Sequence, residues 1–180
     1  HPRPFNPQFQ ALFPLESDFE LRKDRVLKGT YTMVDILDIS KDARNLEIPL
    51  EEIVGFLHRE LGPSADEEPD IRRAVDYALS RAPGKGGFVL TSRENGELVG
   101  TLVVNDTGMS GYIPEHVIVY VAVDHTMRGQ GIGSRLLRQA ITRCEGDVKL
   151  HVAYDNPARN LYERLGFSSK YAEMRLTRHR

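Results

Sequence analysis

The sequence predicts an α/β (α+β) domain with a mixed, mainly antiparallel central sheet of six to seven strands and helices on both faces. Two observations carry this prediction. The turn at Asn95-Gly96 joins two β-compatible stretches, and Asn-Gly is a strong hairpin signal. A strand, a helix and another strand then follow one another over 116–153. This order indicates a parallel pair, because such crossovers join parallel strands.

The first half of the chain contains one expected strand, two expected helices and the hairpin. Residues 30–39 are mostly β-compatible, which predicts a strand. Apolar residues then recur at helical spacing, which predicts helices over 49–61 and 69–81. These residues are Leu50, Ile53, Val54, Leu57 and Leu61 in the first helix, and Ile71, Val75 and Leu79 in the second. The two hairpin strands are expected over 88–91 and 97–104.

The second half of the chain alternates strands and helices. Strands are expected over 116–124 and 148–153, and helices over 131–144 and 157–165. The apolar face of the longer helix is Ile132, Leu136, Leu137, Ala140 and Ile141. From Phe167 the pattern alternates loosely, which predicts one or two terminal strands and completes the count of six to seven.

Composition and charge bound the class of protein. Residues 1–28, broken by several prolines, are expected to be an N-terminal appendage to a single domain over 29–180. The 24 basic and 26 acidic residues leave a formal charge of -2, which argues against a nucleic-acid partner. No apolar run approaches the roughly 20 residues of a membrane helix, so no membrane partner is expected. One cysteine, Cys144, fits a reducing compartment, and we expect a cytoplasmic monomer or homodimer.

A glycine-rich segment follows the most apolar stretch of the chain. Residues 117–123 are apolar on both alternating faces, which predicts a central strand. The chain then runs through Arg128-Gly129-Gln130-Gly131-Ile132-Gly133 directly into a helix. Glycines allow the main chain to approach a ligand, and a helix N-terminus presents unsatisfied N–H groups and a positive dipole end. The segment therefore predicts a site for a phosphate or pyrophosphate.

The glycine spacing limits which classes of ligand fit the segment. A phosphate-binding loop of an NTPase needs Gly-Lys-Ser/Thr, which is absent from the segment, and a dinucleotide fold uses Gly-x-Gly-x-x-Gly early in the chain. Residues 121–133 resemble the acetyl-CoA motif of the GNAT-type N-acetyltransferases, Arg/Gln-x-x-Gly-x-Gly/Ala, with Arg128, Gly131 and Gly133 at its defined positions. Residues 155–167, ending in Leu-Tyr-Glu-Arg-Leu-Gly-Phe, resemble a second motif of the same family. The resemblance covers about 117–167.

The resemblance implies that acetyl-CoA is the donor and a primary amine the acceptor. The amine is expected to attack the thioester directly and take the acetyl group. The main chain of one set of residues is expected to hold the CoA pyrophosphate: Arg128, Gly129, Gln130, Gly131, Ile132, Gly133 and Ser134. The strand residues Val121, Ala122 and Val123 are expected to pair with the pantetheine arm and to polarise the acetyl carbonyl through N–H groups. The Arg128 side chain is either part of this site or a solvated surface charge.

The resemblance implies that Tyr162 is the general acid that protonates the departing thiolate. Tyr162 also lies on the apolar stripe of its helix, so packing is the alternative role. Glu115 and His116, at the start of the central strand, are the candidate bases, or else simply a solvated strand end. Asn156 either contacts CoA or caps the helix that follows, and Asp155 occupies the family's usual Asn position.

The sequence says less about the acceptor substrate than about the donor. An acidic run, Glu60, Asp66, Glu67, Glu68 and Asp70, suggests a cationic acceptor, and a solvated loop between helices is the alternative. No His or Cys cluster has metal-ligand spacing, so no metal is expected. Two other functions stay open, since a fold does not fix a function: a non-catalytic acyl-CoA-binding or regulatory module, and a nucleotide-binding protein.

Overall fold

The computed structural model describes residues 35–40, 48–176 and 178, which all belong to one compact unit, Met33–Arg180. The appendage expected over 1–28 and the first residues of the strand expected over 30–39 lie outside the described residues. None of the described helices combines the length and the apolar composition that a membrane span requires.

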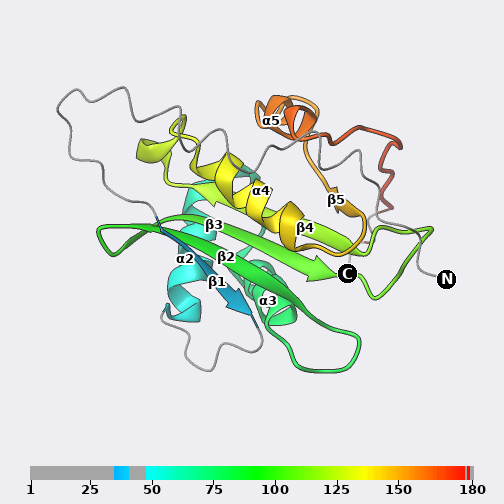
Figure 1. Ribbon diagram of the computed structural model, residues 1–180, viewed down its shortest axis with the longest axis horizontal. Helices are drawn as coiled ribbons and strands as arrows, with labels where there is room; N and C mark the ends of the chain where they lie inside the picture. The colour runs from blue at the N-terminus through cyan, green and yellow to red at the C-terminus, as the bar shows by residue number, and fades with distance from the viewer. Residues whose placement is uncertain (1–34, 41–47, 177, 179–180) are drawn as a thin grey trace. The chain divides into compact units, whose positions relative to one another are not determined.

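The described chain contains the strands and helices drawn in Figure 1. The strands are β1 (Asp35–Ser40), β2 (Gly87–Glu94), β3 (Glu97–Asp106), β4 (His116–Val123) and β5 (Val148–Leu150). The α-helices are α2 (Leu50–Leu61), α3 (Glu68–Ala78), α4 (Ile132–Arg143) and α5 (Arg159–Arg164). Two short 3₁₀ turns, η2 (Gly62–Ser64) and η3 (His125–Met127), complete the list. Each element predicted between 49 and 165 is therefore present, with ends that differ by a few residues.

The sheet is mixed and mainly antiparallel, as the sequence predicts. Its described strands lie in the order β1-β2-β3-β4-β5, with antiparallel pairs up to β4 and a parallel pair between β4 and β5. The prediction of six to seven strands was wrong: the described sheet has five. The expected terminal strands do not form in the described residues after Phe167, where Tyr171, Met174 and Leu176 are 80%, 94% and 85% exposed. An alternating pattern stabilises a strand only when one of its faces is buried.

Helices cover both faces of the sheet, so each face has its own hydrophobic core. Helices α2 and α3 bury residues such as Ile53, Leu57 and Val75 against one face (Figure 1). Helix α4 buries Leu136 and Leu137 against the other face. Each side chain of this size stabilises the fold by roughly 1.5–3 kcal/mol when fully buried.

One glycine sets how closely α4 approaches the sheet. A Cβ atom added at Gly100 on β3 would lie 3.0 Å from Ile132 Cγ2 and 3.0 Å from Leu136 Cδ1, both in the first turns of α4. The absence of a side chain at Gly100 therefore lets the N-terminal end of α4 lie directly on the sheet.

Strand β4 is irregular near its middle and loses its parallel neighbour there. Val103 pairs with Tyr120 and Val104 with Ile118, so Val119 is an extra residue in a β-bulge. The pairing of β4 with β5 ends at Ile118 and Leu150. Beyond this point the edge of β4 has no neighbouring strand among the described residues. The sheet therefore offers a stretch of open β-edge that leads to the end of β4.

Candidate active site at the carboxyl end of strand β4

The loop after β4 turns sharply into helix α4. Asp124 begins the turn, because its carboxylate accepts a hydrogen bond from the Thr126 N–H at 2.9 Å. A hydrogen bond from the Thr126 hydroxyl, together with this N–H contact, holds the pKa of Asp124 below its usual value. Gly129 and Gly131 then adopt positive φ angles of 79° and 84°, a conformation that favours glycine. Gly133 has an ordinary helical conformation and lies inside the first turn of α4.

The first turn of α4 carries unused hydrogen-bond donors. Within the described part of the chain, the N–H groups of Gly131, Ile132, Gly133 and Ser134 donate to no other group. An added Cβ at Gly131 would meet nothing within 4 Å, so the main chain is open on that side. The helix is 12 residues long, and its positive dipole end lies at the same place. Free N–H groups at a helix N-terminus are able to hold an anion, and the phosphate site expected here stays a prediction.

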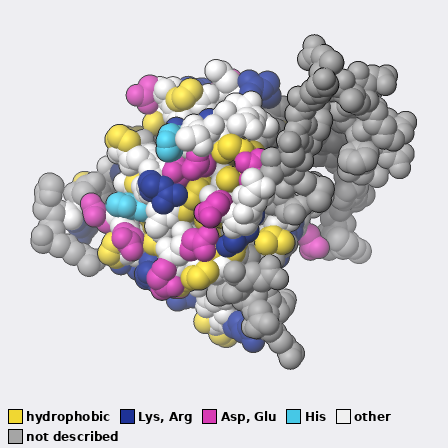
Figure 2. Space-filling model, turned by 90° about the vertical axis from the view of Figure 1, so that its left-hand side faces the viewer, with side chains coloured by type: hydrophobic (Ala, Val, Ile, Leu, Met, Phe, Trp, Pro, Cys, Tyr) yellow, Lys and Arg dark blue, Asp and Glu magenta, His cyan; other side chains and the backbone are white. Residues whose placement is uncertain are grey.

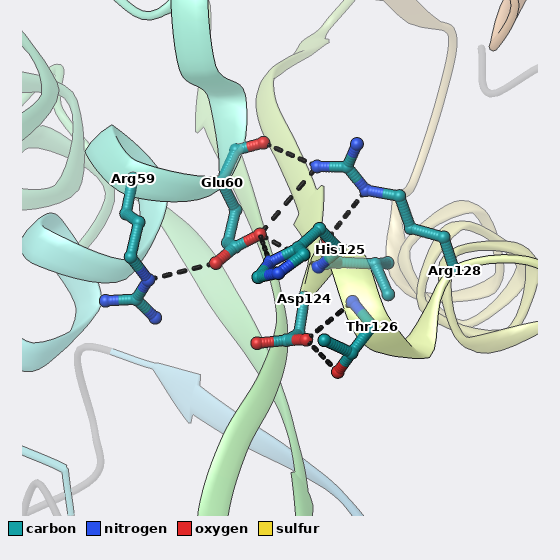
Figure 3. A network of polar contacts seen from close by, with 7 residues as sticks. Arg59, Glu60, Asp124, His125, Thr126 and Arg128 are labelled. Carbon is teal, nitrogen blue, oxygen red and sulfur yellow. Dashed lines mark hydrogen bonds and ion pairs between the residues drawn. The ribbon is translucent and has the colours of Figure 1, made fainter.

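A polar network fastens this loop to the end of helix α2 (Figure 3). The Glu60 side chain is 2% exposed and accepts hydrogen bonds from the His125 N–H and from Arg59 Nε, each at 2.9 Å. Arg128 donates to the main-chain carbonyl of Glu60 at 2.8 Å and to that of Val123 at 3.2 Å. The Arg128 side chain therefore links the loop to the end of α2 and is not only a solvated surface charge.

The same network contains groups that are capable of binding a metal. One ligand-type atom from each of Glu60, Asp124 and His125 lies within 4.8 Å of the others. The Glu60 carboxylate is already engaged by Arg59, and Arg128 NH2 lies 3.8 Å from it. The residues satisfy one another without an ion, so we assign no metal to this cluster. The sequence-based expectation that the protein uses no metal stays a prediction.

The Val121–Val123 segment lies on the open edge of β4. The side chains of Val121 and Val123 pack toward α4, and Ala122 packs toward α2 and α3. Tyr120 also faces α2 and α3, and its hydroxyl donates to Asp66 Oδ2 at 2.6 Å. Burial and this carboxylate both raise the pKa of Tyr120. Sequence reasoning missed this pair, because 54 residues separate its members.

Tyr162 lies on α5 and is half-buried against the α4 side of the sheet. Its ring meets the Phe167 ring edge-on, with 6.1 Å between the centroids. Within the described residues its hydroxyl has no hydrogen-bond partner. Burial raises the pKa of Tyr162, so the phenol keeps its proton at neutral pH. Tyr162 therefore packs against its neighbours and also keeps an O–H group that no described residue uses.

The two candidate bases are fully engaged within the chain. The Glu115 carboxylate accepts hydrogen bonds from the Asp147 N–H at 2.8 Å and the Gly111 N–H at 3.2 Å, and these bonds hold its pKa below the usual value. His116 contacts the Asp106 carboxylate through Nδ1 at 2.9 Å and the Glu145 carbonyl through Nε2 at 3.0 Å. Both partners of His116 are acceptors, so only the doubly protonated ring satisfies both contacts.

Asn156 lies in the turn before α5 and is not the N-cap of that helix, because the N-cap residue is Ala158. The Asn156 side-chain oxygen accepts a hydrogen bond from the Ala158 N–H at 2.9 Å, and its carbonyl accepts one from the Arg159 N–H at 3.1 Å. These contacts organise the turn that leads into α5. The neighbouring Asp155 is exposed. The contact with CoA that the resemblance implies for this segment stays a prediction.

The surface at this end of the molecule is strongly polar. Figure 2 shows the left-hand side of Figure 1, where the loop after β4 lies. Acidic, basic and histidine side chains are interspersed there with scattered hydrophobic ones. A single-sign surface of the kind that binds nucleic acid is not seen on this face.

Comparison with known proteins identifies the family. The model of the acetyltransferase (GNAT) family matches residues 50–167, and the chain therefore belongs to the GNAT family. No curated protein sequence matches the chain.

Several solved structures share the fold. An aminoglycoside N-acetyltransferase in complex with CoA is 13% identical, with a TM-score of 0.60 over 84% of this chain and 99% of that one. A GNAT-family acetyltransferase from Streptococcus pneumoniae is 18% identical, with a TM-score of 0.60 over 82% and 100%. A transcriptional regulator from Bacillus halodurans is 23% identical, with a TM-score of 0.58 over 81% and 99%. At these identities the likeness establishes the fold alone.

Proposed function

We propose that this protein is an acetyl-CoA-dependent N-acetyltransferase whose donor site lies at the end of β4. The observation that carries the proposal is the set of unused N–H groups from Gly131 to Ser134, on a chain of the GNAT family. A pyrophosphate needs several convergent N–H donors and no intruding side chain, and this turn offers both. The aminoglycoside N-acetyltransferase with the same fold is in complex with CoA, which supports the choice of ligand.

The open edge of β4 suits an extended ligand arm. Beyond Ile118 the strand has no parallel neighbour in the described structure, and this open stretch ends at Val123, beside the glycine turn. We infer that the main chain of Val121, Ala122 and Val123 pairs with the pantetheine arm, as an added strand would. When acetyl-CoA is bound, it supplies a thioester acetyl group for attack by an amine. A fixed N–H of β4 near the carbonyl would stabilise the negative charge that attack produces.

Tyr162 is our candidate for the general acid. Its phenol remains protonated at neutral pH because burial raises its pKa, and its hydroxyl is not used by another described residue. A protonated and unengaged O–H group is what a departing thiolate needs. Packing of the ring against Phe167 fixes the side chain, which supports the acid role and does not compete with it.

The contacts of Glu115 and His116 count against a role as general base. An acceptor amine must lose a proton before or during attack. Two N–H donors stabilise the ionised form of Glu115, and His116 would have to break the contact at one ring nitrogen to accept a proton. We therefore favour proton removal through water, with Glu115 and His116 as supports for the start of β4.

The acidic loop between α2 and α3 supports a cationic acceptor. Asp70 pairs with Arg73, and Glu60 is buried in its own network, so these two are committed to the fold. Asp66 is exposed and is held by the Tyr120 hydroxyl next to the β4 bulge. We propose that Asp66, with its neighbours Glu67 and Glu68, attracts an acceptor that carries an ammonium group.

A thiol-release assay tests this function. Acetyl-CoA is offered with a panel of small polyamines, amino sugars and peptides with free N-termini, and products are identified by mass spectrometry. We expect acetylation of at least one cationic amine. Charge reversal at Asp66, Glu67 and Glu68 should raise KM for that acceptor and leave KM for acetyl-CoA unchanged. An unchanged acceptor KM would exclude the cationic site.

A second candidate is a non-catalytic acyl-CoA-binding or regulatory module. Two observations favour it: both candidate bases are engaged, and one solved structure with this fold is a transcriptional regulator. The same assay separates the two functions. Tight CoA binding without thiol release for any amine would support the module, and amine acetylation would exclude it.

A further inference from the structure

The buried carboxylate of Glu60 has no part in the function proposed above. Glu60 lies in the last turn of α2, and its side chain is 2% exposed. Burying a charged group is costly unless it is paired and hydrogen-bonded, and Glu60 has such partners. Apart from the adjacent Arg59, the groups that contact Glu60 in this network, His125 and Arg128, belong to the loop after β4.

Glu60 holds the loop by its side chain and by its main chain. One carboxylate oxygen accepts a hydrogen bond from the His125 N–H at 2.9 Å, and the Glu60 carbonyl accepts one from Arg128 Nη2 at 2.8 Å (Figure 3). His125 and Arg128 bracket the turn that precedes Gly129 and Gly131. The path of the main chain into the phosphate-binding turn is therefore fixed on the α2 side.

The charges around Glu60 indicate that it acts by positioning the loop and not through its own negative charge. A lone carboxylate close to a pyrophosphate site would repel the ligand. Arg59 lies 2.9 Å from Oε1 of Glu60, and Arg128 lies 3.8 Å from Oε2, so the charge is balanced within the network. What remains is a strong acceptor for a main-chain N–H, held in a single position by burial.

We propose that Glu60 is a positioning residue for the donor site: through His125 and Arg128 it preorganises the turn whose N–H groups bind the CoA pyrophosphate. This inference rests on the proposed function for the identity of the ligand. The ordering of the loop by Glu60 is independent of any ligand. Preorganisation increases affinity because the cost of ordering the loop is met before the ligand binds.

Hydrogen–deuterium exchange on the ligand-free protein is the first test. In the wild type we expect the hydrogen-bonded N–H groups of the loop over 124–127, His125 included, to exchange slowly. Glu60→Ala should raise exchange in that loop about tenfold or more, with smaller changes in the sheet. Glu52→Ala is the matched control, since Glu52 lies on the same helix and pairs across to Arg93 on β2 at 3.3 Å. Equal exchange in the loop for the wild type and Glu60→Ala would overturn the proposal.

Calorimetric titration with CoA is the second test. We expect Kd for CoA to rise about tenfold in Glu60→Ala and about threefold in Glu60→Gln, which keeps one acceptor oxygen, and to stay within about twofold in Glu52→Ala. If Glu60 acts only as a negative charge near an anion, Glu60→Gln will bind CoA more tightly than the wild type, which would contradict the positioning role. Should Glu60→Ala fail to fold, Glu60→Gln carries both tests.

The two failures are distinguishable. If the wild type binds no CoA, the proposed function is wrong, and the exchange experiment still decides whether Glu60 orders the loop. If the wild type binds CoA and the Glu60 variants match it in both measurements, the positioning role is wrong and the donor site stands.

Discussion

The two ends of strand β4 differ in whether their polar groups are hydrogen-bonded within the chain. At its carboxyl end, the N–H groups of Gly131 to Ser134 have no partner in the described part of the chain. At its amino end, Glu115 and His116 have every polar atom of their side chains engaged by neighbours. A hollow of about 440 Å³ lies at the amino end, lined in part by Glu115 and His116. The amino end of β4 therefore has a hollow and side chains of catalytic type, whereas the carboxyl end has main-chain N–H donors without a partner in the described residues.

This contrast supports the proposal that the ligand binds at the carboxyl end of β4. Glutamate and histidine are residue types that catalyse proton transfer, but here each already serves the fold. Glycines contribute no side-chain chemistry, yet their turn leaves main-chain donors unpaired, which is costly unless a ligand or water satisfies them. Unsatisfied donors are thus the better guide in this molecule, and the following changes test that view.

Tyr162→Phe should have the largest effect on catalysis. Loss of the proton donor should lower kcat on the order of 100-fold and leave KM for acetyl-CoA unchanged. Because burial raises the pKa of Tyr162, the wild-type acid stays protonated, and kcat should show no descending limb below about pH 10. Steady-state kinetics across pH checks this. Full activity of the variant over the whole range would remove Tyr162 from the mechanism.

Gly131→Val should weaken the donor site directly. A β-branched residue at φ 84° is strained by about 1–2 kcal/mol, and relief of that strain would turn the N–H groups away. We expect Kd for CoA to rise about tenfold. Gly84→Val is the matched control, because Gly84 has φ 78° and open space around it but lies in the loop before β2. Equal effects of the two variants on CoA binding would show that the turn is not the site.

Gly100→Ala should have a moderate effect on both stability and binding. The new Cβ would press on Ile132 and Leu136 at 3.0 Å and move the first turn of α4 away from the sheet. We expect a loss of about 1 kcal/mol in the free energy of unfolding and a CoA affinity a few-fold weaker. Thermal denaturation and calorimetry measure the two. Gly55→Ala, which meets nothing within 4 Å in α2, should keep wild-type affinity.

Glu115→Gln should have the smallest effect on catalysis, with kcat within about twofold of the wild type. Its folded-state pKa is lowered by the Asp147 and Gly111 N–H groups. The ionised carboxylate therefore stabilises the fold above its ordinary pKa of about 4.5, and this stabilisation is lost as pH falls through the lowered value. The variant should be less stable than the wild type near neutral pH, and the difference should shrink in acid. A kcat loss of 100-fold would instead identify Glu115 as the base.

The sequence predicted most of the fold and the location of the glycine turn. Helices and strands between 49 and 165 follow from local periodicity, which is why their positions are right. The terminal strands after Phe167 were predicted from alternation alone, and alternation does not establish that a face is buried. The parallel pair of β4 and β5 followed from the strand–helix–strand order.

The contacts that organise the site were not predictable in the same way. Glu60 appeared in the sequence as one member of an acidic run, and its link to His125 spans 65 residues. Tyr120 and Asp66 meet only because β4 carries a bulge and α2 ends beside it. Glu115 and His116 have the side chains of bases, and only their three-dimensional partners show that both are engaged. Long-range pairing of this kind depends on packing and leaves no local pattern.

The most direct test of the account is an NMR titration of the amide groups with CoA. Addition of CoA should move the resonances of Gly131 to Ser134 more than any others, in a saturable manner, because these N–H groups are the proposed pyrophosphate donors. Resonances at the amino end of β4, near Glu115 and His116, should change little. No saturable binding, or binding that moves the amino-end resonances and leaves Gly131 to Ser134 in place, would contradict the account.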